Sequence, residues 1–293
     1  MSNTAAKKKI TGAKPENFDS ALEERAKPFV KWVGGKGQLV ARLRNKMPEK
    51  YSRYFEPFLG GGALFFSLMP QKAFLSDIND ELINTYEVVR DNVEGLIREL
   101  CKHRYDEEYF YQVRNWDRLE DYLELSPARR ASRFIFLNKT CFNGLHRVNS
   151  KGFFNVPFGD YVNPLILDAA NLRRCSAVLK GSIIRNTSYL SVEESAKTGD
   201  FVYFDPPYAP LSATSSFTSY TSSGFSSADQ AQLRDLCDRL DRKGVLFMLS
   251  NSSAPLILDL YKSFNLSLVD AKRSINSKGN GRGVIKEVLV TNY

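Results

Sequence analysis

The segment Asp205-Pro206-Pro207-Tyr208 has residue types suited to chemistry on a planar amino group. The apolar residues 201–204 precede it and predict a strand that ends at the carboxyl edge of a sheet, where ligand sites form in α/β proteins. Proline fixes φ and has no N–H, so the segment presents its carbonyls in a rigid frame. The Asp205 carboxylate and the Pro206 carbonyl are two acceptors for the two hydrogens of an exocyclic amine.

Such a pair of hydrogen bonds would draw the nitrogen lone pair out of conjugation and direct it at an electrophilic methyl group. This is catalysis of a direct displacement by positioning and electrostatics. Tyr208 offers a flat face for stacking of a flipped base. A proline-rich turn that merely ends a strand is the alternative. The four cysteines, at 101, 141, 175 and 237, lie far from this segment in sequence, which argues against a thiolate mechanism of cytosine C5 methylation.

A glycine-rich turn predicts a nucleoside pocket. Residues 55–62 pass from a strand through three glycines into a helix, and glycine lets the backbone turn sharply and approach a ligand. Asp77 ends the next predicted strand, where its carboxylate can accept two ribose hydroxyls. A tight turn without ligand fits as well. Four residues of the turn are candidate cofactor-binding positions: Glu56, Phe58, Gly60 and Gly62.

A second glycine turn, Gly34-Gly35-Lys36, does not have the spacing of a phosphate-binding loop. No glycine lies five residues before Gly35, and Gly37 stands where that loop has Ser or Thr. We therefore exclude a nucleoside triphosphatase.

Composition and charge indicate a globular protein with a polyanionic partner. The chain has 293 residues, of which 43% are hydrophobic, and it carries no apolar run long enough to cross a membrane and no signal peptide. We expect a cytoplasmic protein without a metal site, because only two histidines are present. The net charge of +8 is concentrated at 1–53 and in two acid-free stretches, 125–159 and 271–286. Ordinary solvated surface would also account for such runs.

Strands alternating with helices predict an α/β fold. We expect strands at 53–57, 73–76, 182–185, 201–204, 245–250, 266–269 and 284–290. Helical periodicity covers 63–68, 82–100 (capped by Asn79), 109–123, 127–138 and 226–240. Residues 140–161 predict a structured loop or hairpin.

These elements suggest three parts. Residues 1–27 predict a disordered basic tail, 28–79 with 168–293 a catalytic domain, and 80–167 an inserted, mainly helical domain. The Ser/Thr-rich segment 212–227 is a candidate lid, and Lys272-Arg273 with Arg282 a candidate contact to a nucleic-acid backbone.

With these motifs, the chain from Pro28 to Tyr293 resembles DNA adenine methyltransferases of the Dam type (class alpha, D12 family). The strongest segments are 29–36, 55–66, 137–161 and 201–214. The resemblance implies a Rossmann-like sheet, S-adenosylmethionine as cofactor, and N6 methylation of a flipped adenine within GATC of duplex DNA, with the enzyme acting as a monomer. It implies that Trp32, Lys36, Asp77 and Asp205 contact the cofactor, and Asp205 also takes part in catalysis.

By the same resemblance, 137–149 is a hairpin that recognises DNA, with Arg147 contacting a guanine in the major groove. Leu145 and Pro157 would contact the outer bases, Phe142 would insert into the base stack and Lys31 would contact the first base pair. Three further candidates in the hairpin are Lys139, Asn143 and Asn149.

The chain departs from the family at a few positions. His146 and Val148 stand where relatives often carry Cys and Tyr, and Phe142 replaces a Tyr. We expect His146 on the hairpin surface, and phosphate contact or plain solvation for Arg129, Arg130 and Arg133. Two alternatives remain open: an amino methyltransferase acting on cytosine N4 or on an RNA base, and a DNA-binding module that has lost catalysis.

Overall fold

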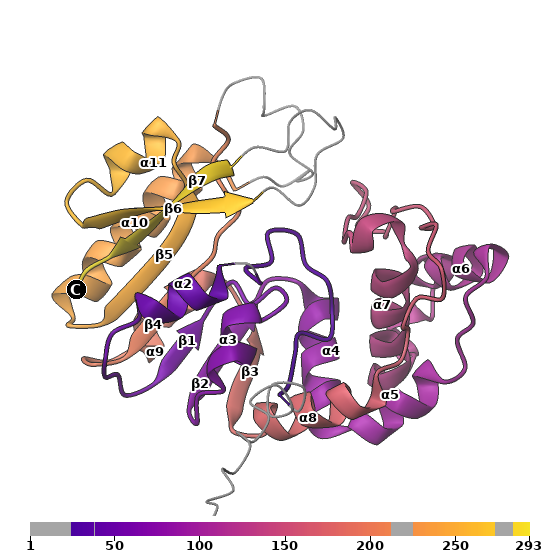
Figure 1. Cartoon of the computed structure of the whole chain (residues 1–293). Coiled ribbons are helices and arrows are strands. Elements are labelled where there is room, and N and C mark those ends of the chain that lie inside the picture. Colours follow the sequence, from indigo (N-terminus) through magenta and orange to yellow (C-terminus); the bar gives the residue numbers. More distant parts are fainter. Residues whose placement is uncertain (1–24, 38, 212–224, 273–283) are drawn as a thin grey trace, which may run out of the picture.

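The computed structural model describes residues 25–37, 39–211, 225–272 and 284–293 (Figure 1). The predicted tail up to residue 24, most of the candidate lid at 212–227, and Arg273 and Arg282 lie outside these ranges. The described residues form a seven-stranded sheet in the order β3-β2-β1-β4-β5-β7-β6. Its strands are β1 (Tyr54–Glu56), β2 (Ala73–Asp77), β3 (Ser182–Asn186), β4 (Phe201–Phe204), β5 (Leu246–Ser252), β6 (Asn265–Lys272) and β7 (Val284–Thr291).

The sheet is mixed, since β7 runs antiparallel to both of its neighbours while the pairs among β1 to β5 are parallel. The strand order reverses between β1 and β4. In a doubly wound sheet such a reversal opens a crevice at the carboxyl ends of the strands, which is where ligands bind. The glycine turn follows β1 and Asp205 follows β4, so both predicted motifs lie at this crevice.

Alternation along the strands divides the core between the two faces of the sheet. Phe201 and Tyr203 of β4 join one hydrophobic cluster, and Val202 and Phe204 join the other. The first cluster is completed by α2 (Val40–Asn45), α3 (Ala63–Leu68), α4 (Asp80–Asp91), α5 (Val93–Leu100), α7 (Pro127–Thr140) and α8 (Ala169–Leu179). The second is covered by α9 (Val192–Ser195), α10 (Ser227–Arg242) and α11 (Pro255–Leu260).

The predicted strands are confirmed to within a few residues, and the α/β architecture with them. The helical run over 82–100 is wrong as one helix, because it breaks at Asn92, whose φ of −142° is not helical. The Asn79 cap is confirmed: its side chain accepts the backbone N–H of Leu82 at 2.9 Å. The helix expected over 109–123 ends earlier. It is α6 (Glu107–Arg114), followed by two 3₁₀ turns, η1 (Asn115–Arg118) and η2 (Tyr122–Glu124).

The expected hairpin is an irregular loop with two isolated antiparallel bridges, Cys141 to Phe158 and Val148 to Phe154. It begins with the 3₁₀ turn η3 (Phe142–Gly144). In Figure 1 it lies beyond the end of α7, with α6 on its outer side. The helices α4 and α7 contribute to the same core as the sheet, and a smaller cluster around Phe110, Phe136 and Phe154 holds the loop. The division at residues 80 and 167 stays a prediction. No described helix has the length and apolarity to cross a bilayer.

Candidate active site and nucleic-acid interface

Asp205 meets Lys36 at the crevice between β1 and β4. The Lys36 Nζ lies 2.7 Å from Asp205 Oδ1 and donates to the Gly34 carbonyl at 2.8 Å, and it stands 4.4 Å from the centre of the Tyr208 ring. Lys36 is 6% exposed and Asp205 is 19% exposed, so the cation is buried while the carboxylate keeps some access to solvent. The second glycine turn therefore delivers a cation to the Asp-Pro-Pro-Tyr segment, although the two are separated widely in sequence.

A chain of hydroxyls fixes the Asp205 carboxylate from the neighbouring strand. The Ser250 hydroxyl donates to Asp205 Oδ1 at 2.9 Å, and the buried Tyr203 hydroxyl lies 3.0 Å from Ser250 Oγ. Since Ser250 has one proton and donates it to Asp205, Tyr203 is the donor of the second bond. Within the described ranges, Oδ1 receives both donors and none reaches Oδ2. One carboxylate oxygen is thus engaged by the protein, and the other is left for a ligand.

The remainder of the segment is held by side chains from β5, β7 and α10. The Tyr208 hydroxyl donates to Glu287 Oε2 at 2.6 Å, and Gln230 Nε2 donates to the Pro207 carbonyl at 3.0 Å. Asn251 accepts the N–H of Ala209 at 3.1 Å and also bonds Gln230. Burial raises the pKa of Tyr208 well above its ordinary range. Tyr208 therefore stays an uncharged ring with a fixed orientation.

Sequence reasoning missed these supporting residues. A signal was present for two of them, because Ser250 and Asn251 are polar residues at the carboxyl end of an apolar, fully buried strand. A buried polar side chain must find a partner, so polar residues there indicate a site. Glu287 and Gln230 gave no such signal, since a single acid in a strand and a glutamine in an amphipathic helix are ordinary surface residues.

The glycine turn after β1 is shaped by its neighbours. Gly60 has φ of +47° and Gly62 of +64°. A Cβ on Gly60 would lie 2.5 Å from Trp32 Cδ1, and one on Gly62 would lie 2.8 Å from the Tyr86 hydroxyl oxygen. Trp32 thus packs directly on the backbone of the turn, and both positions require glycine for conformation and for space.

Asp77, at the end of β2, faces the same turn. Its Oδ2 accepts the Gly60 N–H at 3.0 Å, and its Oδ1 accepts the Asn79 N–H at 3.1 Å. Burial raises its pKa above the ordinary value, while these bonds lower it. Next to it, the Ile78 side chain is 77% exposed. An acidic acceptor, an open apolar side chain and a turn without Cβ atoms are the groups that a nucleoside needs, so these residues fit S-adenosylmethionine.

Glu56 ends β1, and Phe58 follows it just before the glycine turn. Glu56 is 3% exposed and accepts the Tyr54 hydroxyl at 2.7 Å. Burial raises the pKa of Glu56 to about 8, with a smaller contribution from the charge of Asp205. Phe58 stacks on Tyr189 with ring centres 5.1 Å apart.

The candidate DNA-contacting residues share the loop after α7. Phe142 is 52% exposed, and Asn143 beside it has φ of +55°. The Arg147 Nε donates to Asn155 Oδ1 at 2.6 Å, across the loop. Asn138 joins Lys31 to the loop, because its amide bonds the N–H and the carbonyl of Lys31 and the carbonyl of Gly144. Sequence reasoning missed both Asn138 and Asn155.

Among the other loop candidates, some side chains are used to hold the loop itself and others are accessible to a ligand. Asn149 accepts the backbone N–H groups of Lys151 and Phe153 at 2.9 and 3.1 Å, so its side chain closes the turn. Pro157 is exposed, and Leu145 is half-buried. Burial, with the charge of Lys31 nearby, lowers the pKa of Lys139.

Two expectations about nearby residues are met only in part. His146 is half-buried, since its ring packs against Trp32, Phe134 and Phe154. Two of the three arginines of α7 are paired with acids, while Arg129 is exposed, as expected for a solvated residue. Arg130 pairs with Glu81, Arg133 pairs with Asp117, and Arg129 lies over the Trp116 ring. Regular charge on a helix did not reveal that acids from other segments neutralise Arg130 and Arg133.

Sequence comparison agrees with this geometry. The model of the D12 class N6 adenine-specific DNA methyltransferases matches residues 32–275. The chain is 49% identical to the type II methyltransferase M1.LlaDCHI of Lactococcus lactis subsp. cremoris, over 91% of this chain and 95% of that protein. It is 43% identical to the type II methyltransferase M.MjaIII of Methanocaldococcus jannaschii, over 91% and 99%. A DNA adenine methylase of Serratia marcescens is 35% identical, over 91% and 98%.

The alternatives of cytosine N4 methylation, RNA methylation and a DNA-binding module without catalysis therefore have no support. The chain belongs to the D12 class of N6 adenine-specific DNA methyltransferases.

Proposed function

We propose that this enzyme uses S-adenosylmethionine to methylate adenine N6 within GATC of duplex DNA, as a monomer on a flipped base. The observation that carries the chemistry is the Asp205 carboxylate, with Oδ1 engaged by Lys36 and Ser250 and Oδ2 without a donor in the described part of the chain. A carboxylate oxygen that no protein donor occupies is the arrangement needed to accept one amine hydrogen.

In this proposal the residues of the crevice orient the base. Asp205 Oδ2 accepts one N6 hydrogen and the Pro206 carbonyl accepts the other, which localises the nitrogen lone pair. Tyr208, fixed by Glu287, stacks on the adenine ring. S-adenosylmethionine would supply a methyl group on a positively charged sulfur. Trp32, Gly60 and Gly62 would shape its pocket, and Asp77 would accept its ribose hydroxyls.

The GATC assignment rests on the loop between residues 141 and 159. Its Arg147 has the guanidinium fork that recognises guanine in the major groove, and Asn155 fixes one edge of that fork. Phe142 is exposed at the loop and available to enter the base stack. Lys31 would contact the first base pair, and Leu145 and Pro157 the outer bases.

The test is to express the chain in a host without DNA methylation and to map N6-methyladenine over the whole DNA. We expect methylation at GATC and nowhere else. Methylation at a different sequence would refute GATC while leaving the chemistry, and an absence of methyladenine would refute both.

Asp205→Ala is the matched control for the chemistry. We expect this variant to bind duplex DNA as the wild type does and to transfer no methyl group, because the acceptor for the amine is lost. Methyl transfer by the variant at an appreciable rate would contradict the role of Asp205.

A further inference from the structure

We propose that His146 is a positioning residue that couples the cofactor pocket to the DNA-recognition loop. The inference rests on the proposed function, since it takes the Gly60 turn as the cofactor site and Arg147 as a base-contacting residue. His146 immediately precedes Arg147 in the loop. It contacts two residues next to the proposed cofactor site, Trp32 and Asn79.

The first contact is with Trp32. The two rings stack with centres 5.5 Å apart and planes 20° apart. Trp32 in turn lies against the Gly60 backbone, where a Cβ would come within 2.5 Å of its ring. Trp32 is therefore in contact both with the turn proposed to hold the cofactor and with the ring of His146.

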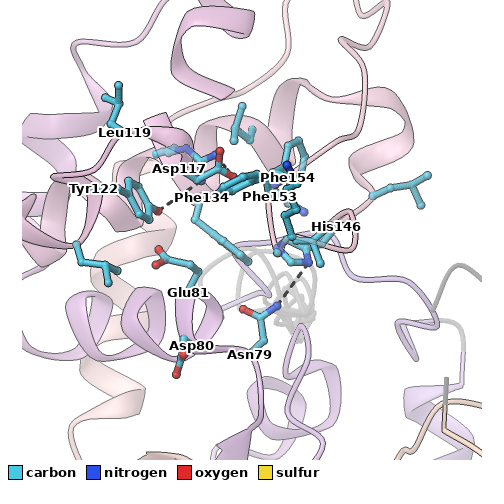
Figure 2. Close-up of a pocket in the computed structure, with 18 of the residues that line it drawn as sticks. Asn79, Asp80, Glu81, Asp117, Leu119, Tyr122, Phe134, His146, Phe153 and Phe154 are labelled. Atoms are coloured by element: carbon cyan, nitrogen blue, oxygen red, sulfur yellow. Dashed lines mark hydrogen bonds and ion pairs between the residues drawn. The ribbon is translucent and has the colours of Figure 1, made fainter. Parts of the chain in front are cut away.

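The second contact is with Asn79 (Figure 2). The side-chain amide of Asn79 lies 3.4 Å from His146 Nδ1, while its backbone N–H donates to Asp77 Oδ1. Burial lowers the pKa of His146 to about 4, so the ring is uncharged at neutral pH and Nδ1 can accept the amide hydrogen. Asp77 and His146 are thus joined through one residue.

On the loop side, His146 packs against Phe134 of α7 and Phe154 of the returning strand of the loop. A cavity of about 480 Å³ borders the same part of the loop and is lined by Val148, Phe153 and Phe154 as well as His146. Asn138 and the cluster around Phe154 also hold the loop. The contacts of His146 to Trp32 and Asn79 add a direct link between the neighbour of Arg147 and the turn proposed to bind the cofactor.

The consequence is energetic coupling. A cofactor that restrains Trp32 and Asp77 also restrains His146. The loop then loses less conformational entropy when the duplex binds, which makes duplex binding more favourable. Coupling between two binding sites is reciprocal, so the duplex must raise cofactor affinity by the same factor.

The experiment measures the Kd of S-adenosylhomocysteine by calorimetry, with and without a duplex carrying the sequence that the methylation map identifies. For the wild type we expect the duplex to tighten binding at least about 5-fold, the lower end of typical coupling. In His146→Ala the ratio of the Kd without duplex to the Kd with duplex should fall to near one. His146→Phe, which keeps a ring but no nitrogen, should retain part of it.

Two further variants isolate the contacts. Asn79→Ser keeps an oxygen that can cap α4 but loses the amide, so it should lower the ratio without unfolding the helix. Ser150→Ala changes an exposed residue of the same loop and should keep the wild-type ratio.

The fluorescence of Trp32 gives a second readout. The chain has two tryptophans, so Trp116→Phe leaves Trp32 as the sole one. Its emission should change on duplex binding when His146 is present and not in His146→Ala. A wild-type ratio of one would overturn the proposal, as would a His146→Ala variant that weakens cofactor binding equally with and without duplex. The methylation map of the wild type tests the proposed function separately.

Discussion

The two oxygens of Asp205 illustrate how one carboxylate can serve both structure and chemistry. Lys36 and Ser250 converge on Oδ1, which holds the side chain in one rotamer before any substrate arrives. Catalysis by positioning depends on such preorganisation, because a donor or acceptor that must reorient at the moment of reaction loses much of its effect.

Ser250→Ala tests this arrangement at the residue scale. A hydrogen bond to a charged group contributes about 1.5–3 kcal/mol, so we expect kcat to fall by about 10- to 100-fold with little change in the KM for DNA. Ser250→Thr keeps the hydroxyl and should restore most of the rate. Tyr203→Phe removes the donor one step further away and should have a smaller effect. Equal kcat in Ser250→Ala and the wild type would show that Asp205 needs no second donor.

Asn155→Ala tests the orientation of Arg147. The variant keeps the arginine and its charge but loses the acceptor at 2.6 Å from Nε. Arg147→Ala should cost about 1–3 kcal/mol of discrimination at one guanine, and Asn155→Ala should cost part of that amount while leaving binding to unrelated duplexes unchanged. The measurement is kcat/KM on duplexes with each substitution in the site. Asn155→Asp, which keeps an acceptor, should resemble the wild type.

At the scale of elements, the strand–turn–helix after β1 carries the tightest constraint. Gly60→Ala places a Cβ in the left-handed region and against Trp32. We expect it to destabilise the fold by about 1–3 kcal/mol and to weaken binding of S-adenosylhomocysteine, because Trp32 must move.

Gly152→Ala is the control that separates two effects of Gly60→Ala, the backbone strain of a positive φ and the steric clash of the new Cβ with Trp32. Gly152 also has a positive φ, of +82°, but a Cβ there meets nothing within 4 Å. It should lower the Tm and leave cofactor affinity unchanged. If both variants bound the cofactor equally well, the packing of Trp32 on the turn would have no functional role.

The elements were largely predictable from sequence where they are regular. The apolar run 201–204 is the strand β4, and Asn79 caps α4 as its type and position predicted. The break at Asn92 was not predictable from periodicity, because Val89 and Val93 continue the apolar spacing across it. The loop at 141–159 was recognised by composition, but its irregular pairing depends on side-chain bonds such as that of Arg147 to Asn155.

At the scale of the whole molecule, the site is assembled from distant segments. Lys36, Asp205 and Glu287 come from the beginning, the middle and the end of the described chain. The local Asp-Pro-Pro-Tyr pattern predicted Asp205, whereas Lys36 was expected at the site only from the family resemblance. Glu287 and His146 depend on which segments the fold brings together, and neither spacing nor residue type contains that information.

The pH dependence of stability is also a property of the whole molecule, and Glu56 contributes to its neutral and alkaline side. Its folded pKa is about 8 and its unfolded value about 4.5, so between these values the unfolded chain has lost a proton that the folded chain keeps. Stability must then fall as pH rises through this window. Glu56→Gln removes the effect, so its Tm relative to wild type should increase from pH 5 to pH 8. A constant difference in Tm would contradict the raised pKa.

The two histidines contribute to the acid side with the opposite sign. Burial lowers the pKa of both His103 and His146 to about 4. Between about pH 6.5 and pH 4 the unfolded chain binds protons at these rings and the folded chain does not. Stability therefore falls as pH falls, by at most about 1.4 kcal/mol per pH unit for each ring.

His103 is the better test, because it stacks on Phe136 and bonds Tyr109 and Ser132, away from the catalytic crevice. His103→Phe keeps the stacked ring and loses both bonds, so it should be less stable than the wild type at pH 7. Because it has no proton to gain, this deficit should shrink as the pH falls from 6.5 to 5 in urea unfolding. A deficit that stays constant or grows would mean that the His103 imidazole is already protonated in the folded protein.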